Sequence, residues 1–462
     1  MKKIRQEVND LFHRGMDSHM RLAVTGLSKA GKTAFITSLS NQLLYSSIDD
    51  NLPLLSASRD KRLIGAKRVP QTNMMVPRFS YDEAMDSLQE VPAQWPEPTK
   101  DVSEIRLALR YKPKKGAKRL LTDSSTLYLD IIDYPGEWLL DLPLLEMSFE
   151  QWSETQFSSL KGIRSELAKP WLESLKDLDP LAEANEKEIE RISLVYTEYL
   201  YRCKEEGLHW VQPGRFVLPG ELKGAPVLQF FPYSDTENPE QLKKASKHSV
   251  YGMLRTRYQE YQTKVVKRFY KEYFATFDRQ IVLVDCLQPL NAGYESFHDM
   301  KSALEQIMKS FRYGRSSLLK RLFSPRIDKI LFASTKADHV TPEQHTSLLS
   351  LLQQMVHPSW QHAAFENIDM ECMTIASIRA TTTGFVSNGD ENVPALQGTT
   401  SDGVPLTIYP GEVPEKLPKK EFWENNRFDF NSFRPMESSS DTALNHIRID
   451  KALQYLIGDK LK

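Results

Sequence analysis

Gly26-Leu27-Ser28-Lys29-Ala30-Gly31-Lys32-Thr33 is the most informative run of this sequence. It fits the pattern G-x-x-x-x-G-K-[ST], in which a glycine-rich loop joins a strand to a helix and cradles a phosphate group. The apolar run at 21–25 precedes the loop, and a helical pattern follows it to about residue 44, as the motif requires. We therefore expect an α/β fold of the phosphate-loop (P-loop) NTPase class.

Each residue type in this loop has a chemical reason. The glycines let the backbone bend so that successive N–H groups point at the anion, and the helix that begins near Gly31 adds its positive end. Lys32 is expected to reach the β- and γ-phosphate oxygens and to serve catalysis, and Thr33 to ligate Mg²⁺. The other loop residues expected at the nucleotide are Gly26, Ser28, Lys29, Ala30, Gly31 and Ala34. The alternative is a glycine-rich turn with a solvated lysine.

Composition and charge narrow the class of protein. The chain has 462 residues, more than one ordinary core holds. Its 60 basic and 61 acidic residues give no whole-chain reason to expect nucleic acid or an acidic membrane as partner. We expect no secretory signal and no membrane span, because no apolar run approaches the roughly 20 residues that cross a bilayer. Cys203, Cys286 and Cys372 lie far apart and are expected to be reduced thiols, so the cytoplasm is favoured.

Short apolar runs alternate with helical patterns, which predicts a mostly parallel sheet. The expected strands are residues 21–25, 102–111, 127–132, 281–284, 329–332 and 373–376. Residues 50–100 are rich in Pro, Ser, Asp and Arg and read as a long irregular segment. Amphipathic patterns predict helices at 1–18 and at 447–461.

Residues 139–277 are mostly helical in pattern, which predicts a large helical insertion. The expected nucleotide-binding core is then made of residues 1–138 and 278–462. Within the core, an enlarged loop segment is expected at about 45–100 and a C-terminal extension at about 386–462. The insertion is either a partner-binding or sensing domain, or a rigid helical lid.

Asp133-Tyr134-Pro135-Gly136 directly follows the strand expected at 127–132. An aspartate at the end of such a strand can hold Mg²⁺ through a water, and the Gly136 N–H can contact a γ-phosphate. The motif is short, and its position after the phosphate loop is what makes it credible. A strand-ending turn is the alternative.

Thr335-Lys336-Ala337-Asp338 follows the strand expected at 329–332. The Asp338 carboxylate can accept two hydrogen bonds from guanine N–H groups, which adenine lacks, while the Lys336 stem packs on the base. Leaving a buried carboxylate unpaired is costly, so such a contact discriminates between bases. A helix N-cap or an exposed turn is the alternative.

A fourth element should close the base site, with a backbone N–H that meets the guanine carbonyl. Ala376-Ser377-Ile378-Arg379 stands in the expected place, after the apolar run that begins at Met373. We therefore expect Ser377 and Ile378 at the nucleotide.

These four motifs, in this order, resemble the Ras-like GTPase superfamily. Within it, the runs at 25–33, 129–145, 376–380 and 446–459 are similar to those of the YcjX family of bacterial stress-associated GTPases. The resemblance covers essentially the whole chain. It implies a Ras-like core and a GTP- and GDP-binding protein that is made with the heat-shock response.

The resemblance also implies a first-switch threonine that completes the Mg²⁺ shell and touches the γ-phosphate. Thr99 is our candidate for this nucleotide and metal contact, and Thr72 is a lesser one. Glu137 stands where Ras-like enzymes carry the glutamine that orients water, and we keep it as a catalytic candidate. Because a carboxylate is repelled by a γ-phosphate, we predict slow intrinsic hydrolysis that a partner accelerates. Thr335 stands where asparagine is usual, so bonding between loops is expected to be weaker there.

The sequence leaves three functions open. The first is a GTP-dependent switch that acts through an unidentified protein effector or activator. The second is an ATP-driven P-loop enzyme, and the third is a scaffold that holds nucleotide without cycling. No nucleic acid is expected as partner. The helix at 1–18 either packs on the core or lies on a membrane-bound partner.

Overall fold

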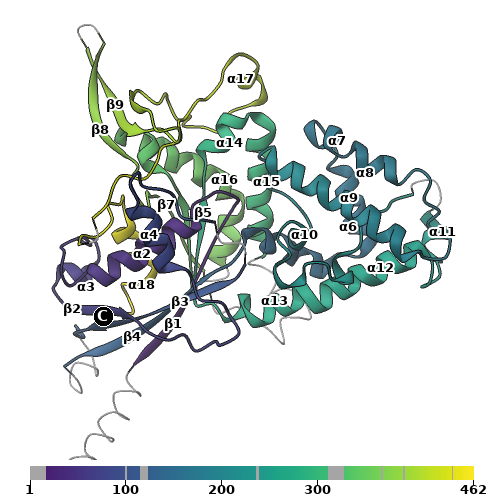
Figure 1. Ribbon diagram of the computed structural model, residues 1–462, viewed down its shortest axis with the longest axis horizontal. Coiled ribbons are helices and arrows are strands. Elements are labelled where there is room, and N and C mark those ends of the chain that lie inside the picture. Colours follow the sequence, from purple (N-terminus) through teal and green to yellow (C-terminus); the bar gives the residue numbers. More distant parts are fainter. Residues whose placement is uncertain are drawn as a thin grey trace, which may run out of the picture. The chain divides into compact units, whose positions relative to one another are not determined.

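The computed structural model describes residues 17–98, 101–114, 123–235, 239–310, 327–365, 368–388, 391–439 and 441–462. These residues fall into two compact units, whose elements Figure 1 labels. The first unit takes the described residues of Met1–Tyr134, Phe277–Asn291 and Arg326–Lys462. The second takes those of Pro135–Thr276 and Ala292–Pro325.

A seven-stranded sheet is the centre of the first unit. Its strands are β1 (Ser18–Gly26), β2 (Leu63–Arg68), β3 (Ser103–Tyr111), β4 (Ser125–Asp133), β5 (Arg279–Val284), β6 (Lys329–Ser334) and β7 (Asp369–Thr374). They lie in the order β2-β3-β4-β1-β5-β6-β7, and β4, β1, β5, β6 and β7 are parallel. Their near-continuous apolar runs suit a sheet that is buried on both faces. The mostly parallel sheet that the sequence predicts is therefore confirmed.

Helices cover both faces of this sheet (Figure 1). The sheet is contacted by α2 (Lys32–Tyr45), α16 (His345–Phe365) and α18 (Ile449–Ile457). The other helices of this unit are α3 (Ser56–Arg59), α4 (Tyr81–Gln89), α14 (Leu287–Ala292) and α17 (Lys420–Asn425). Alternate side chains of the strands, such as Leu22 and Leu331, join one core with residues of α2 and α18, such as Phe35 and Leu453. The α16 helix contacts β6 and β7. This layering holds the carboxyl ends of the parallel strands open for a site.

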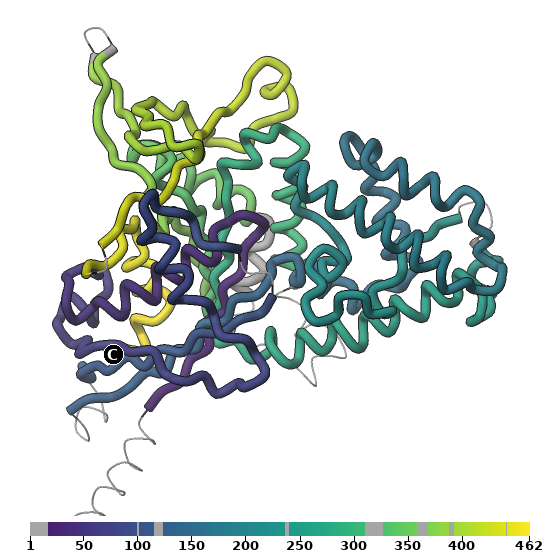
Figure 2. The backbone as a smooth tube through the Cα atoms, viewed as in Figure 1, coloured from purple at the N-terminus to yellow at the C-terminus, as the bar shows by residue number. Residues whose placement is uncertain are grey.

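The C-terminal part of the chain returns beside its beginning, as the yellow and purple tubes show in Figure 2. The Gln42 amide donates to the Leu444 carbonyl at 2.5 Å, and Asp450 accepts from the Leu54 N–H at 3.0 Å. The fully buried Arg279 of β5 also pairs with Asp459, at 2.6 Å between Nη2 and Oδ2. The C-terminal segments are thus an integral part of the first unit.

The described residues of 50–98 are not irregular throughout, so the expectation of one long irregular segment was wrong. They form α3, β2 and α4, and β2 pairs with β3 in antiparallel fashion. The sequence of β2 shows no alternation of apolar and polar residues. It is an edge strand that forms by pairing with β3 and does not bury one face. For α4 a signal was present, since acidic residues Asp82 and Glu83 stand in its first turn after Ser80.

Other expected borders also shift. The strand expected at 373–376 is β7, Asp369–Thr374, and the closing helix expected at 447–461 is α18, Ile449–Ile457. A second, antiparallel sheet went unpredicted; it consists of β8 (Thr381–Asn388), β9 (Glu391–Thr399) and β10 (Pro405–Ile408). The helix expected at 1–18 lies almost wholly outside the described residues.

Helices make up the second unit, as expected for the region after residue 138. They are η1 (Gly136–Glu146), α6 (Phe149–Ser158), α7 (Ile163–Leu167), α8 (Lys169–Ser174), α9 (Glu186–Glu205), α10 (Gly214–Val217), η2 (Gly220–Leu222), η3 (Pro226–Leu228), α11 (Pro239–Lys243), α12 (Val250–Glu260), the π-helix η4 (Tyr261–Val266), α13 (Lys267–Glu272), η5 (Phe274–Thr276) and α15 (Tyr294–Ser310). Aromatic side chains fill its core, where Trp152 stacks on Tyr258 with ring centroids 5.2 Å apart. Within the described part of the chain, no helix is both long and apolar enough to cross a bilayer.

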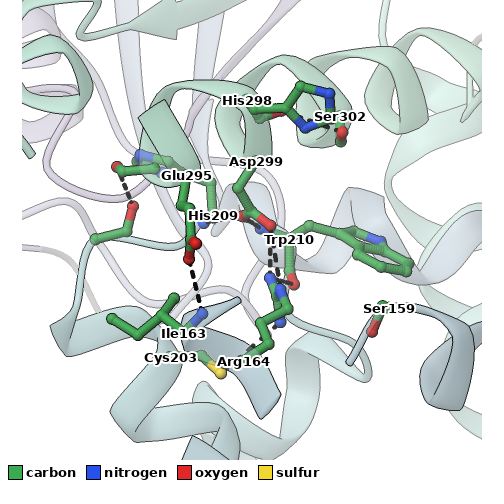
Figure 3. Close-up of polar contacts among 12 residues, drawn as sticks. Ser159, Ile163, Arg164, Cys203, His209, Trp210, Glu295, His298, Asp299 and Ser302 are labelled. Atoms are coloured by element: carbon green, nitrogen blue, oxygen red, sulfur yellow. Dashed lines mark hydrogen bonds and ion pairs between the residues drawn. The ribbon is translucent and has the colours of Figure 1, made fainter. Parts of the chain in front are cut away.

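Buried polar contacts join α15 to the rest of the second unit (Figure 3). The Arg164 guanidinium lies 2.7 Å from Asp299 of α15, and the same guanidinium donates to the Trp210 carbonyl at 2.6 Å. The other Asp299 oxygen accepts from the N–H groups of His209 and Trp210. A carboxylate with this many donors is a satisfied buried charge, and it fixes α15 to α7 and to the chain after α9.

Candidate functional site

The phosphate loop joins β1 to α2 and takes the shape that its sequence predicts. A Cβ atom on Gly26 would lie 2.8 Å from the Leu283 carbonyl oxygen, so only glycine fits beside β5. Gly31 has φ 82°, in the left-handed region, and stands directly before α2. The first turn of a helix does not use its N–H groups in intrahelical bonds, so the start of α2 is suited to receive an anion.

A cavity of about 400 Å³ opens at this loop. Its lining brings together three of the predicted motifs: the phosphate loop, the Thr335–Asp338 run and the Ala376–Ile378 run. The residues of these motifs that line it are Lys29, Ala30, Gly31, Lys32, Thr33, Ala34, Thr335, Lys336, Asp338, Ala376, Ser377 and Ile378. Gly26 and Ser28 belong to the loop but not to this lining. The cavity has the size of a small-molecule site.

Asp338 is held in place on the cavity wall. Its side chain is buried, and its Oδ2 accepts from the Ala380 N–H at 2.6 Å. Its backbone carbonyl accepts from the Thr381 hydroxyl. These bonds tie the loop after β6 to the chain after β7, so the carboxylate is positioned before any ligand arrives.

The loop that holds Ser377 and Ile378 is fixed from both sides. Ala376 exchanges two backbone hydrogen bonds with Ile447, at 3.1 and 2.8 Å. The Ala337 N–H donates to the Ile375 carbonyl at 3.0 Å, so this loop and the Asp338 loop move as one.

Lys336 has an acidic partner that the sequence analysis missed. Its Nζ lies 2.6 Å from Oδ2 of Asp285, which is 3% exposed at the end of β5. Burial opposes ionisation of Asp285, but Lys336 and the Gln288 N–H outweigh it and lower the pKa of this carboxyl. An acidic residue directly after the apolar run 281–284 was the available signal. The pair lines a second cavity, of about 230 Å³, that shares Lys29 and His339 with the first.

Thr335, which stands where asparagine is usual, bonds to the neighbouring strand β5. Its N–H donates to the Val284 carbonyl at 2.9 Å, and its hydroxyl reaches the same oxygen only at 3.5 Å. Both bonds tie the end of β6 to the end of β5, and a longer asparagine side chain would reach further.

Two further segments line the cavity; the first belongs to the run around the candidate Thr99, and the second had no predicted site residue. Trp95, Pro96 and Pro98 come from the chain after α4. Ser401, Ser432 and Phe433 come from the C-terminal extension. No local pattern marks Trp95 or Phe433 itself, because both reach the cavity only through the tertiary fold.

Thr33 and Asp133 offer hard oxygen donors of the kind that Mg²⁺ prefers. Thr33 lies in the first turn of α2, and Asp133 is buried at the carboxyl end of β4, opposite Val24 of β1 in the strand register. A hydroxyl and a carboxylate at these places suit a magnesium site beside the phosphate loop.

Gly136 and Glu137 belong to the second unit, and their described contacts lie within it. The Glu137 carboxylate is 6% exposed and pairs with Lys204 of α9, at 2.7 Å between Oε1 and Nζ. The next residue, Trp138, donates its indole N–H to the Leu218 carbonyl at 3.1 Å. The segment expected to sense a γ-phosphate is thus built into the helical unit.

Thr99 lies outside the described residues. Thr72 is exposed and does not line the cavity. The threonine expected in the first switch therefore stays a prediction.

Comparison with known proteins gives consistent relatives over the whole chain. The sequence model of the YcjX-like family, DUF463, matches residues 20–461. A protein of Escherichia coli (strain K12) named Ras-like GTPase YcjX is 54% identical over 465 residues, covering 100% of both chains. A protein of the same name from Shewanella oneidensis is 47% identical, covering 100% of this chain and 99% of its own.

Proposed function

Because the chain belongs to the YcjX-like family, we propose that it binds GTP and GDP with Mg²⁺ and acts as a nucleotide-dependent switch that hydrolyses GTP slowly. The observation that carries this proposal is the shared cavity of the phosphate loop and Asp338. A phosphate chain at the loop and a base at Asp338 are the two ends of one nucleotide. The GTPase name of both relatives supports guanine as that base.

In this proposal the protein promotes hydrolysis by positioning the phosphates and by offsetting their negative charge. Lys32 and the first-turn N–H groups of α2 bind the phosphate oxygens and offset the charge that develops on the transferred group. Thr33 and Asp133 would hold Mg²⁺, which would offset the negative charge of the phosphate groups. From the family resemblance, we expect Gly136 to sense a γ-phosphate through its backbone N–H, and Thr99 to contribute a further metal ligand.

The ion pair between Glu137 and Lys204 supports slow hydrolysis. An ionised carboxylate that pairs with Lys204 at 2.7 Å is a poor acceptor for a proton from water. Such an enzyme needs a partner protein to supply the group that positions the attacking water, as activating proteins do for other GTPases. We assign the protein to the cytoplasm and to a stress response, with an effector that binds one nucleotide state.

Two titrations test the nucleotide assignment. In the first, GTP or ATP displaces labelled GDP in the presence of Mg²⁺. GTP should displace it at a far lower concentration than ATP does. Asp338→Ala should weaken GTP binding strongly, whereas Asp369→Ala, at the opposite end of β7, should leave it unchanged. Tight ATP binding that Asp338→Ala leaves intact would favour the ATP-driven enzyme and remove the guanine proposal. Single-turnover hydrolysis should be slow in the isolated protein.

A nucleotide-bound scaffold that does not cycle is the second candidate, and the Glu137–Lys204 ion pair favours it. Capture of partner proteins by the GDP-bound form and by a form loaded with non-hydrolysable GTP analogue separates the two. A switch gives different partners in the two states, and identical capture contradicts it.

A further inference from the structure

The cavity has two walls that do not belong to the phosphate-loop motifs, and one hydrogen bond joins them. Trp95 lies in the segment that precedes β3, and Phe433 lies in the C-terminal extension; both line the cavity. The indole Nε1–H of Trp95 donates to the Phe433 carbonyl at 2.8 Å. The two segments meet at the nucleotide cavity although they are far apart in sequence.

Building on the proposed function, we propose that Trp95 and the backbone of Phe433 form a clasp that retains the bound guanine nucleotide. The clasp makes the C-terminal extension part of the control of nucleotide release. A nucleotide leaves quickly when the indole swings away from the Phe433 carbonyl and slowly while the bond is made.

Phe433 is the fixed half of the clasp. Its side chain is 1% exposed and meets the His339 ring edge-on, with centroids 5.3 Å apart. A Cβ atom on Gly398 would lie 2.8 Å from the Phe433 ring, so the ring packs directly on the β9 backbone. Phe433 also bridges Thr400 in antiparallel fashion, and the next residue donates to the Thr399 carbonyl at 2.8 Å. The acceptor carbonyl is therefore held in one place.

The His339 contact links this fixed half to base recognition. His339 directly follows Asp338, and its Nδ1 lies 3.0 Å from the Asn431 carbonyl, so that ring nitrogen donates. The chain at 431–433 and the chain at Asp338 are thus joined on one side of the cavity. A base held by Asp338 lies against the same wall that holds Trp95.

Trp95 is the half that can move. Its side chain is 40% exposed, and it follows α4 in a segment without regular structure. An indole presents a large flat apolar face with one donor, which suits stacking on a purine or ribose while the N–H is fixed elsewhere. Ser438 separately donates to the Leu88 carbonyl at 3.2 Å, so the C-terminal extension stays attached to α4 when the Trp95 bond is lost. Variants at Trp95 should therefore fold.

Release of methylanthraniloyl-GDP from the full-length chain tests the clasp. Trp95→Phe keeps an aromatic face but removes the donor, and it should speed release about fivefold, the effect of one neutral hydrogen bond. Trp95→Ala removes the face as well and should speed release further. The matched control is Trp423→Phe, because Trp423 also donates its indole N–H to a backbone carbonyl, that of Leu290 at 3.4 Å, and does not line the cavity. Its release rate should stay within about twofold of wild type.

Energy transfer gives a second readout that mere stability would not change. Tryptophan emission excites the methylanthraniloyl group, and the chain has 7 tryptophans. The transfer signal should fall strongly in Trp95→Phe and hold in Trp423→Phe. Wild-type release rates in both Trp95 variants, with folding confirmed by circular dichroism, would overturn the clasp. Failure of the wild type to bind the labelled GDP would instead overturn the proposed function, and the clasp with it.

Discussion

The fold holds the Asp338 side chain in place beside the cavity, where we propose that it binds the base. One oxygen accepts from the Ala380 N–H at 2.6 Å, and the residue also lines the cavity. Replacement by alanine would remove both the proposed contact with the base and the acceptor of the Ala380 N–H. Replacement by asparagine is the sharper test, because the amide oxygen can keep the bond to Ala380 while its NH₂ group changes the ligand preference.

Asp338→Asn should therefore change the base preference of the site from guanine to xanthine. Xanthine carries a carbonyl where guanine carries its exocyclic amine, and an amide N–H matches that carbonyl. We expect GTP affinity to fall about 10- to 100-fold, the range for a hydrogen bond to a charged group, and xanthosine triphosphate affinity to rise. Competition against labelled GDP and labelled xanthosine diphosphate measures both. Equal losses for the two bases would contradict a direct contact with the base.

His345 is neutral in the folded protein for reasons of geometry. Its Nε2 lies 2.8 Å from the Ala337 carbonyl and so donates, and its Nδ1 accepts from the Arg448 guanidinium at 3.3 Å. Burial lowers the pKa of His345, and the nearby Arg448 charge lowers it further; the bond to Ala337 and the charges of Asp338 and Glu343 oppose this without prevailing. A proton on Nδ1 would face the arginine directly.

The sign of the pH dependence follows from this lowered pKa. The unfolded chain takes up the proton near pH 6.5, whereas the folded chain resists it, so the stability from His345 is present above about pH 6.5 and is lost as the pH falls below it. The loss is at most ~1.4 kcal/mol per pH unit for one histidine. Thermal unfolding between pH 7.5 and pH 5.5 should show a shallower decline in His345→Gln than in wild type. Parallel curves would rule out a contribution from this residue.

At the scale of elements, the packing of η1 against α10 depends on one glycine. A Cβ atom on Gly214 would lie 2.1 Å from the Glu137 carbonyl oxygen, a backbone atom that cannot rotate away. The Gly214 N–H also donates to both oxygens of Asp141, at 2.8 and 3.0 Å, and Tyr261 donates to the same carboxylate at 2.6 Å. The backbones of η1 and α10 therefore sit in direct contact over a buried polar network.

Gly214→Ala should force these two backbones apart. Overpacking of this kind costs about 1–3 kcal/mol, and the helical signal should melt several degrees lower. Gly384→Ala is the control, because a Cβ atom there meets nothing within 4 Å. Binding of labelled GDP should survive in both variants, since Gly214 lies in the other unit. Unchanged melting of Gly214→Ala would mean that the contact is loose.

The sequence predicts an element well when that element is formed by interactions between residues close together in the sequence. The loop at 26–33 and the apolar strands predict the core because a strand–glycine loop–helix unit is determined by its own residues. The β2 strand was not predicted because it is defined by its pairing with β3, which lies elsewhere in the sequence. Trp95 and Phe433 were not predicted because only the tertiary fold brings these distant residues together at the cavity. Asp285 is different, since an acidic residue at a strand end was visible and went unused.

At the scale of the whole molecule, the segment expected to sense the γ-phosphate is not a free loop. Besides the contacts of Glu137, Trp138 and Asp141, the Tyr258 hydroxyl and the Gln262 amide donate to the Met147 carbonyl, at 3.1 and 2.8 Å. These partners lie on α9, α10, α12 and η4 of the second unit. A displacement of Gly136 therefore cannot stay local without breaking several buried contacts.

Nucleotide state should consequently be readable in the helical unit itself. We expect hydrogen exchange to differ between the form with GTP analogue and the form with GDP in residues 136–146 and, by a comparable factor, in the peptides around Lys204, Gly214 and Gln262. Such coupling through packed elements requires that both nucleotide states bias the same element. Glu137→Gln removes the ion pair with Lys204, and it should reduce the difference around Lys204 while leaving that around Gly214, which depends on Asp141. A difference confined to residues 136–146 would mean that the sensing segment moves alone and that the second unit is a static attachment.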